Sequence, residues 1–222
     1  MPVVELKNIS KTFHMGKVSV PALRGIDLTV EKGEFLVLKG QSGSGKSTTL
    51  NIIGCLDVPT SGTVVISGES TDRMNDRELS YLRRHHIGFI FQNFNLIPVL
   101  NALENVEYPL KLKKVENARE KAKEALIQVG LEKQMKHRPN ELSGGQIQRI
   151  AIARGIVSQP DILLADEPTA NLDSKTSDQI MDLMLNLNQN RNLTFIVVTH
   201  QETVMSQASR TVELQDGLVV SR

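Results

Sequence analysis

Cysteine and excess charge of either sign are scarce in this sequence. One residue of 222 is a cysteine, Cys55, which excludes an internal disulfide framework and a cysteine-rich zinc site. The 26 Lys+Arg and 25 Asp+Glu residues leave a formal net charge of +1. The chain therefore has no overall field that would attract nucleic acid or an anionic membrane.

Long hydrophobic runs are lacking as well. No stretch reaches the roughly 18 uninterrupted apolar residues of a membrane span. The first residues, MPVVELKN, carry charges at Glu5 and Lys7, where a signal peptide needs an apolar run. Since 40% apolar and 23% charged residues are ordinary for a folded protein, we predict a soluble, cytoplasmic chain that contacts a membrane only through a partner.

Short β-rich runs alternate with helical stretches, which is typical of a mostly parallel sheet covered by helices. Three of the runs, FLVL, ILLA and FIVV, are almost continuously apolar and suit strands buried on both faces. The sequence therefore predicts an α/β fold with its clearest strands at residues 34–39, 87–91, 162–166 and 194–199.

Helices and one hairpin complete this prediction. We expect helices from residue 46 to about 54 and from 174 to about 189, with Met181 and Met184 in the core. Residues 101–158 are helical in pattern, and the charges of 111–123 are typical of a solvated helix face. Asp216-Gly217 between two apolar runs predicts a hairpin.

A glycine-rich segment follows the first of these strands. Residues 40–47, GQSGSGKS, match G-x-x-x-x-G-K-[ST], with a strand before the match and a helix after it. Glycines let several backbone N–H groups face one anion, and the helix start points its positive end there. Lys46 adds a charge for the β- and γ-phosphates, and the Ser47 hydroxyl can ligate Mg²⁺. The segment predicts a nucleotide-binding phosphate loop rather than an ordinary Gly/Ser turn.

A later apolar strand ends in two carboxylates. In DILLADE, Asp166 comes to the phosphate end of a parallel sheet, where it is positioned to hold Mg²⁺. Glu167 is one residue further, points differently, and can orient or deprotonate an attacking water. A solvated strand terminus would give the same pair, so this interpretation depends on the phosphate loop.

A third motif lies just before this strand. Residues 142–146 read LSGGQ, in which Ser143 is a good helix N-cap and Gly144-Gly145 leave the helix start bare of side chains. This is a second helix start that can bind an anion. In this order the motifs resemble those of ATP-binding-cassette ATPases, and the resemblance extends from Phe13 to His200.

The resemblance implies a P-loop NTPase fold, with a RecA-like parallel-sheet core, an antiparallel β subdomain and an inserted α-helical subdomain. It assigns residues 1–91 and 159–222 to the core with its β subdomain, and 92–158 to the helical subdomain. It also implies a head-to-tail homodimer that binds two ATP molecules. Each ATP lies between the phosphate loop of one copy and the Ser143-Gly144-Gly145 segment of the other.

The resemblance also implies a role for each matching residue. His200 is the expected switch histidine at the γ-phosphate, and Gln92 is expected to touch Mg²⁺ and to report on a membrane partner. A buried histidine and a surface amide are the ordinary alternatives. The expected catalytic residues are Glu167, His200 and Lys46. The expected Mg²⁺ ligands are Ser47, Gln92 and Asp166.

Two further positions have an alternative interpretation. Phe13 is expected to stack on adenine, although a Phe near a strand end more often belongs to the core. Asp173 resembles part of the loop that crosses the dimer interface, and it can also cap the following helix. The expected nucleotide contacts are Phe13, Gly40, Gln41, Ser42, Gly43, Ser44, Gly45, Lys46, Ser47, Thr48, Gln92, Ser143, Gly144, Gly145, Gln146 and Asp173.

Several segments resemble one branch of this family, which holds the lipoprotein-releasing and macrolide-exporter ATPases. They are LNIIGCLDVPTSG, IGFIFQNFNLIP, NALENVEYPL and LADEPTANLDS. The resemblance implies a separate integral membrane permease that holds the chain at the inner face of the membrane. A cell-division ATPase that regulates cell-wall hydrolysis is one alternative, and a soluble cassette protein acting on nucleic acid or ribosomes is another. The single cassette and near-neutral charge disfavour the latter, so no nucleic-acid partner is expected.

Overall fold

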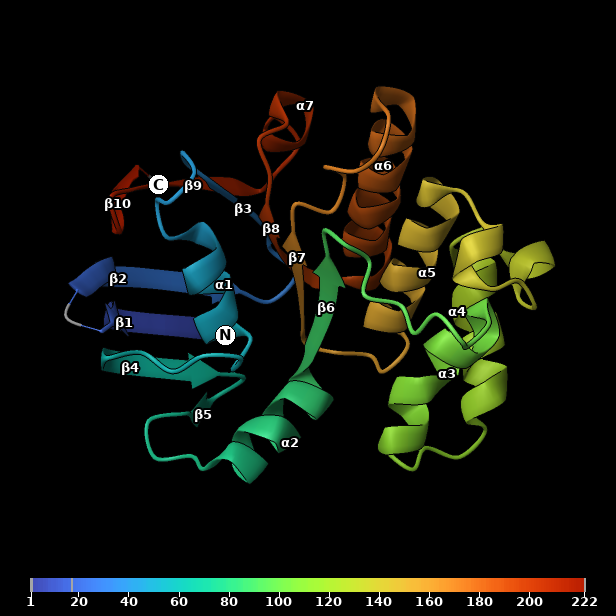
Figure 1. Ribbon diagram of the computed structural model, residues 1–222, viewed down its shortest axis with the longest axis horizontal. Helices are drawn as coiled ribbons and strands as arrows, with labels where there is room; N and C mark the ends of the chain where they lie inside the picture. Colours follow the sequence, from blue (N-terminus) through green and yellow to red (C-terminus); the bar gives the residue numbers. More distant parts are fainter. Residues whose placement is uncertain (1, 17, 222) are drawn as a thin grey trace.

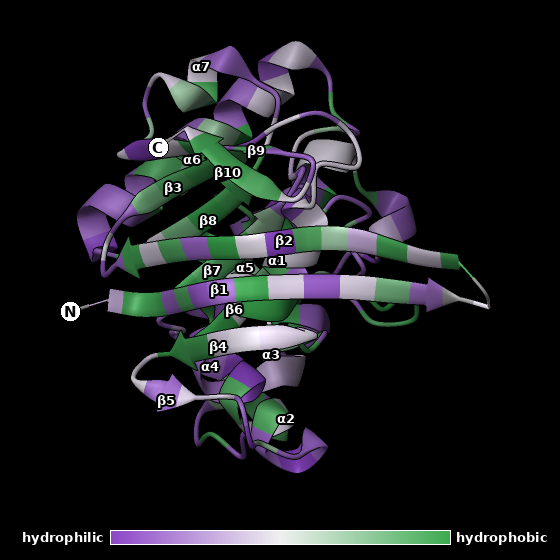
Figure 2. Cartoon of the chain, turned by 90° about the vertical axis from the view of Figure 1, so that its left-hand side faces the viewer, coloured by the Kyte–Doolittle hydropathy of each residue, from purple (hydrophilic) through white to green (hydrophobic). Residues whose placement is uncertain are grey.

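A long antiparallel hairpin opens the chain. In the computed structural model, which describes residues 2–16 and 18–221, β1 (Pro2–Met15) pairs with β2 (Val18–Glu31). Strands β4 (Ser61–Ile66) and β5 (Glu69–Ser70) complete a four-stranded sheet of order β2-β1-β4-β5. Apolar and polar residues alternate along these strands, so one face of the sheet lies on the core (Figure 2).

A second sheet, with six strands, forms the centre of the molecule (Figure 1). Its strands are β3 (Phe35–Lys39), β6 (Ile87–Phe91), β7 (Ile162–Asp166), β8 (Thr194–Val198), β9 (Arg210–Gln215) and β10 (Leu218–Ser221), in the order β10-β9-β3-β8-β7-β6. All neighbours are parallel except β9 and β10, which the predicted turn at Asp216-Gly217 joins. The four predicted strands are confirmed, with β3 and β8 one residue shorter at one end.

The parallel order brings four strand ends to one edge of this sheet. The phosphate loop follows β3, Gln92 follows β6, and His200 lies two residues beyond β8. Asp166 is the last residue of β7, and Glu167 follows it. Segments up to 160 residues apart in the sequence therefore meet at this edge.

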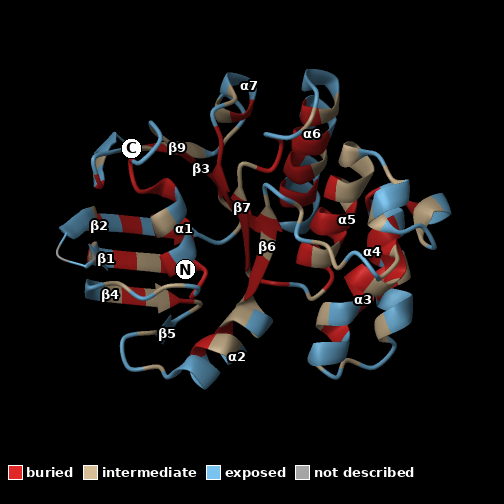
Figure 3. Cartoon of the chain, in the orientation of Figure 1, coloured by how far each residue is buried: buried red, intermediate tan, exposed pale blue. Residues whose placement is uncertain are grey.

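Helices cover both faces of the sheet (Figure 3). Successive strand residues point to opposite faces, so Phe35 and Val37 join one core while Leu36 and Leu38 join the other. Helices α3 (Ala102–Leu112), α4 (Ala118–Gln128), α5 (Gly144–Ile156), α6 (Ser174–Arg191) and the short α7 (Glu202–Met205) contribute to the first core. The antiparallel sheet, α1 (Lys46–Ile53) and α2 (Asp76–His86) contribute to the second.

The predicted helical middle is confirmed as α3, α4, two short 3₁₀ helices, η1 (Glu132–Gln134) and η2 (Pro139–Glu141), and α5. Met181 and Met184 are buried, as predicted. Helix α2 was not predicted, because Leu79 and Leu82 are its only buried residues. Its available signal was a capping box, in which Asn75 and Glu78 bond each other's backbone N–H groups.

No helix among the described residues has both the length and the apolar character needed to span a bilayer.

Candidate functional site

The phosphate loop is a tight turn held by its glycines. Gly40 has a φ of 144°, and a Cβ there would lie 2.1 Å from the main-chain oxygen of Leu214. Gly45 has a φ of 104° and is the N-cap of α1. Any other residue would be strained at either position, so the sequence forms this turn only with glycine. The turn leaves the start of α1 open toward the loop, as an anion site requires.

Lys46 folds back over this loop. Its Nζ donates hydrogen bonds to the main-chain oxygens of Gly40 at 2.7 Å and Gln41 at 2.9 Å. Burial lowers the pKa of Lys46 from its ordinary value, and the charges of Glu167 and Asp166 oppose this shift. The ammonium therefore lies in a partly desolvated site beside two carboxylates, where it can also bind a phosphate oxygen.

Asp166 and Ser47 meet across the sheet edge. The Ser47 hydroxyl donates to Asp166 Oδ1 at 3.4 Å, which is a long hydrogen bond. Burial raises the pKa of Asp166, while the Ser47 hydrogen bond and the Lys46 charge partly offset the rise. The carboxylate is thus partly desolvated, and Ser47 and Lys46 offset this only in part, which is the setting a bound cation would relieve.

Glu167 forms an ion pair with His200. The distance from Glu167 Oε1 to His200 Nε2 is 3.0 Å. Glu167 has a φ of 49°, a conformation uncommon outside glycine, and its N–H donates to the Val198 oxygen at 3.0 Å. This strained position turns the Glu167 side chain away from that of Asp166 and toward the end of β8. One carboxylate faces the serine, and the other faces the histidine.

These groups surround one cavity of about 470 Å³. Of the expected phosphate-loop residues, Gly40, Gln41 and Ser44 do not line it. The Gly40 and Gln41 carbonyls hold Lys46, and the buried Ser44 hydroxyl has no hydrogen-bond partner among the described residues. Ala22, on β2, lines the cavity and was not predicted, since only tertiary structure brings the hairpin to the loop. The lining residues are Ala22, Ser42, Gly43, Gly45, Lys46, Ser47, Thr48, Gln92, Asp166, Glu167 and His200.

The LSGGQ segment lies outside this cavity. Ser143 is the N-cap of α5, as predicted, and the structure adds a capping box with Gln146. A Cβ on Gly145 would meet Thr176 at 2.5 Å. Asp173 caps α6 by accepting a hydrogen bond from the Thr176 N–H at 3.0 Å. The phosphate loop and the LSGGQ segment of one chain therefore do not share a ligand cavity.

Phe13 also lies outside the lining, on the exposed part of the β1–β2 hairpin. Its residue surface is 41% exposed, so it is not a core phenylalanine. The Lys11 ammonium lies 5.0 Å from the Phe13 ring centroid and is held by Asp57 at 2.6 Å and the Val58 oxygen at 2.8 Å. Lys11 therefore covers one side of the ring.

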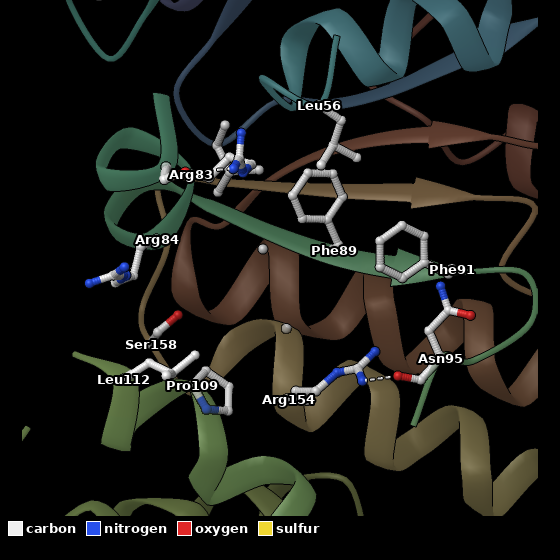
Figure 4. Close-up of a pocket in the computed structure, with 14 residues that line it drawn as sticks. Leu56, Arg83, Arg84, Phe89, Phe91, Asn95, Pro109, Leu112, Arg154 and Ser158 are labelled. Atoms are coloured by element: carbon white, nitrogen blue, oxygen red, sulfur yellow. Dashed lines mark hydrogen bonds between the residues drawn. The ribbon is translucent and has the colours of Figure 1, made fainter. Parts of the chain in front are cut away.

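A second hollow, which we call the helical groove, lies along β6 and has a volume of about 490 Å³ (Figure 4). The stacked rings of Phe89 and Phe91, 5.4 Å apart, lie in its wall. Arg154 crosses it and donates to the main-chain oxygens of Phe94 and Asn95. No carboxylate is among the described residues that line it: Leu56, Ser80, Arg83, Arg84, Ile87, Gly88, Phe89, Phe91, Asn95, Pro109, Leu112, Arg154, Gly155 and Ser158.

Known proteins are similar to this chain in sequence and in fold. Residues 23–170 match the protein-family model for the ABC transporter family. MJ0796 of Methanocaldococcus jannaschii, named as an uncharacterized ABC transporter ATP-binding protein, is 49% identical, over 98% of this chain and 95% of that protein. A dimeric structure of MJ0796 in a post-hydrolysis state, bound to ADP and Pi, has a TM-score of 0.90 to this chain and covers 98% of it and 97% of that chain.

Two further relatives come from transport systems. The lipoprotein-releasing system ATP-binding protein LolD of Geobacter metallireducens is 47% identical, over 99% of this chain and 98% of that protein. The macrolide export ATP-binding/permease protein MacB of Syntrophobacter fumaroxidans is 44% identical over 99% of this chain, which matches 31% of that protein.

The parallel sheet, the phosphate loop and the acidic strand end define a P-loop nucleoside triphosphatase. The chain belongs to the ABC transporter family, as an ATP-binding and ATP-hydrolysing subunit of the LolD and MacB type.

Proposed function

We propose that this subunit uses ATP to drive a separate integral membrane permease, in export, lipoprotein release or mechanotransmission. The observation that carries the proposal is the convergence of the phosphate loop, Asp166, Glu167 and His200 on one cavity. The chain is similar to nearly the whole of LolD but to 31% of MacB, whose name includes a permease.

In this proposal the phosphate loop and Lys46 bind the triphosphate, with Phe13 stacking on adenine. Lys46 exchanges its carbonyl partners for phosphate oxygens as the nucleotide enters. Glu167 orients the attacking water and accepts its proton, since its carboxylate already lies in the cavity. His200 holds Glu167 through the 3.0 Å ion pair and donates a hydrogen bond to the γ-phosphate.

The donor set fits Mg²⁺. Ser47 and Asp166 lie 3.4 Å apart, and Gln92 lines the same cavity. Within residues 2–16 and 18–221 no cluster of three or more His, Cys, Asp or Glu side chains could hold a metal. A few oxygen ligands from the protein combined with phosphates are typical of Mg²⁺. When bound, Mg²⁺ supplies positive charge that stabilises the leaving phosphate oxygens.

We propose that two copies bind ATP head to tail. The segment from Ser143 to Gln146 does not line the nucleotide cavity of its own chain, yet it is a capped helix start with the geometry of an anion site. A second copy would bring it to the γ-phosphate. The dimeric MJ0796 structure supports this arrangement, as does the position of Asp173 at the start of α6. In this proposal residues 92–158 form a helical subdomain that carries the segment.

We propose that the permease docks in the helical groove. Strand β6 lines the groove along most of its length, and Gln92, which directly follows it, lines the nucleotide cavity, so an occupant would act on the active site through one strand. An apolar segment with an acidic residue would suit the aromatic wall and Arg84, since no carboxylate is among the described residues that line the groove. This contact would keep the chain at the inner face of the membrane.

The proposal is tested with Glu167→Gln. Because the amide cannot accept the water proton, we expect phosphate release to fall by at least about 100-fold while MgATP still binds. The arrested protein should accumulate as an ATP-dependent dimer, measured by light scattering coupled to size exclusion. Glu202→Gln, an exposed carboxylate on α7, is the matched control and should hydrolyse ATP at the wild-type rate.

Normal hydrolysis by Glu167→Gln would overturn the catalytic assignment. Arrested hydrolysis without any dimer, at protein concentrations well above those of the assay, would overturn the head-to-tail arrangement.

A further inference from the structure

Asn171 connects two loops that follow neighbouring strands of the parallel sheet. Its Nδ2 donates hydrogen bonds to the main-chain oxygen of Gln92 at 3.0 Å and to Asn93 Oδ1 at 3.3 Å. Gln92 directly follows β6, whereas Asn171 belongs to the loop between β7 and α6. These residues are 79 positions apart, so the contact belongs to the fold and not to local sequence.

The loop that carries Asn171 is itself held by hydrogen bonds. The Ala170 N–H donates to the Glu167 oxygen at 3.2 Å, and the Leu172 N–H donates to the Thr169 oxygen at 3.1 Å. Asp173 then caps α6. Glu167 and Asn171 therefore belong to two overlapping hydrogen-bonded turns, 167–170 and 169–172, so the position of one constrains the position of the other.

The far end of the loop after β6 is held by a residue that lines the helical groove. Arg154, on α5, donates to the main-chain oxygens of Phe94 and Asn95. Four consecutive residues thus have two separate supports. Asn171 holds Gln92 and Asn93 from the active-site side, and Arg154 holds the next two from the groove.

We propose that Asn171 is a positioning residue for hydrolysis. It fixes the main chain at Gln92, and so sets where the Gln92 side chain enters the nucleotide cavity relative to Glu167. If an occupant of the groove displaced the loop after β6, the displacement would reach the Glu167 turn through the hydrogen bonds of the Asn171 side chain. This inference rests on the proposed role of Gln92 at Mg²⁺.

The test measures ATP hydrolysis by the purified full chain against free Mg²⁺ concentration. Asn171→Ala removes both hydrogen bonds, and Asn171→Asp keeps the shape but replaces the donor with a carboxylate oxygen. We expect either variant to raise the Mg²⁺ concentration for half-maximal rate by about three- to tenfold, since the hydrogen bond that fixes the main chain of Gln92 is lost. Binding of ATP in the presence of a chelator should not change.

Asn93→Ala is the matched control. It removes only the 3.3 Å contact and leaves the bond from Asn171 to the Gln92 oxygen. Its Mg²⁺ requirement should stay within about twofold of the wild-type value, because the shorter, main-chain bond is the one that fixes Gln92.

A double-mutant cycle separates positioning from a general structural role. Gln92→Ala alone should raise the Mg²⁺ requirement, and adding Asn171→Ala to it should change nothing further. If Gln92→Ala raises the requirement but Asn171→Ala does not, the inference is wrong and the proposed function stands. The inference is also wrong, and the proposed function also stands, if the effects of Gln92→Ala and Asn171→Ala on the Mg²⁺ requirement add in the double variant. If Gln92→Ala has no effect, the proposed metal role of Gln92 is wrong, and the inference falls with it.

Discussion

At the residue scale, the charge of Asp166 opposes folding of the nucleotide-free chain. Burial raises the pKa of Asp166, and the Ser47 hydrogen bond and Lys46 charge do not cancel the rise. A carboxyl that binds its proton more tightly when folded stabilises the fold below its ordinary pKa, and this contribution is lost as the pH rises through the raised value. At neutral pH the ionised side chain is therefore a cost, which a bound cation would offset.

Asp166→Asn should consequently stabilise the nucleotide-free protein at pH 7. We expect the thermal midpoint to rise by about 1–3 °C, and the difference from wild type to shrink as the pH falls toward about 3.9. Hydrolysis should fall by at least about 100-fold in the same variant, because the anionic oxygen is gone. Calorimetry across this pH range and a phosphate-release assay measure the two effects.

Asp178→Asn, on the exposed side of α6, is the control and should shift the midpoint by less than about 1 °C. A lower midpoint for Asp166→Asn at pH 7 would mean that Ser47 and Lys46 stabilise the charge by more than burial destabilises it.

Individual residues of the site differed in how well sequence could predict them. Lys46 and Ser47 follow the loop after one strand, and Asp166 ends another. Because parallel strand ends share an edge, the sequence alone was enough to predict that these residues lie close together. The ion pair of Glu167 with His200 needs a left-handed φ at Glu167, and no residue type in that segment signals it. The bond from Asn171 to Gln92 depends on two loop conformations at once, which a linear pattern does not contain.

At the element scale, β6 and α5 approach each other closely at two glycines, Gly88 and Gly155. A Cβ on Gly88 would lie 2.4 Å from the main-chain oxygen of Gly155. A Cβ on Gly155 would come no nearer than 3.0 Å, to the end of the Leu163 side chain. Both glycines line the helical groove, so this close crossing defines the groove's base.

Gly88→Ala should therefore destabilise the chain more than Gly155→Ala. We expect Gly88→Ala to lower the free energy of unfolding by about 1–3 kcal/mol, because a backbone oxygen cannot yield as a side chain can. For Gly155→Ala, the higher helix propensity of alanine, up to about 1 kcal/mol, offsets the mild overlap with Leu163. Urea unfolding of both variants measures the order, and the reverse order would mean that the crossing is not limited by the backbone at Gly88.

Elements built on continuous apolar runs were predicted to within a residue, because burial on both faces leaves little choice of boundary. Helix α2 was missed because only two of its eleven residues, Leu79 and Leu82, are buried, so few apolar residues mark it in a run that is otherwise mostly polar. The helical groove could not be predicted either. It is formed by α2, β6, α3 and α5, and only their packing determines that it is hollow.

At the scale of the whole molecule, β6 connects two separate sites. Ile87, Phe89 and Phe91 line the helical groove, while Gln92 lines the nucleotide cavity. Strand β6 is paired to β7 along its length. In the arrangement we propose, a permease in the groove would contact β6 itself, and the nucleotide would contact Gln92, the residue that directly follows it.

A charge in the groove should separate partner binding from hydrolysis. Leu112, 51% exposed on α3, lines the groove, whereas Ile127, also 51% exposed, lies on α4 outside it. We expect Leu112→Asp to reduce recovery of the permease by at least about tenfold, since an unpaired carboxylate buried at an apolar contact costs several kcal/mol. The permease is recovered with the chain from detergent-solubilised membranes and identified by mass spectrometry. ATP hydrolysis by the isolated chain should stay within about twofold, and Ile127→Asp should affect neither measurement. Equal loss of the permease in both variants would mean that it does not dock in this groove. Loss of hydrolysis in Leu112→Asp alone would mean that the groove supports the active site even without a partner.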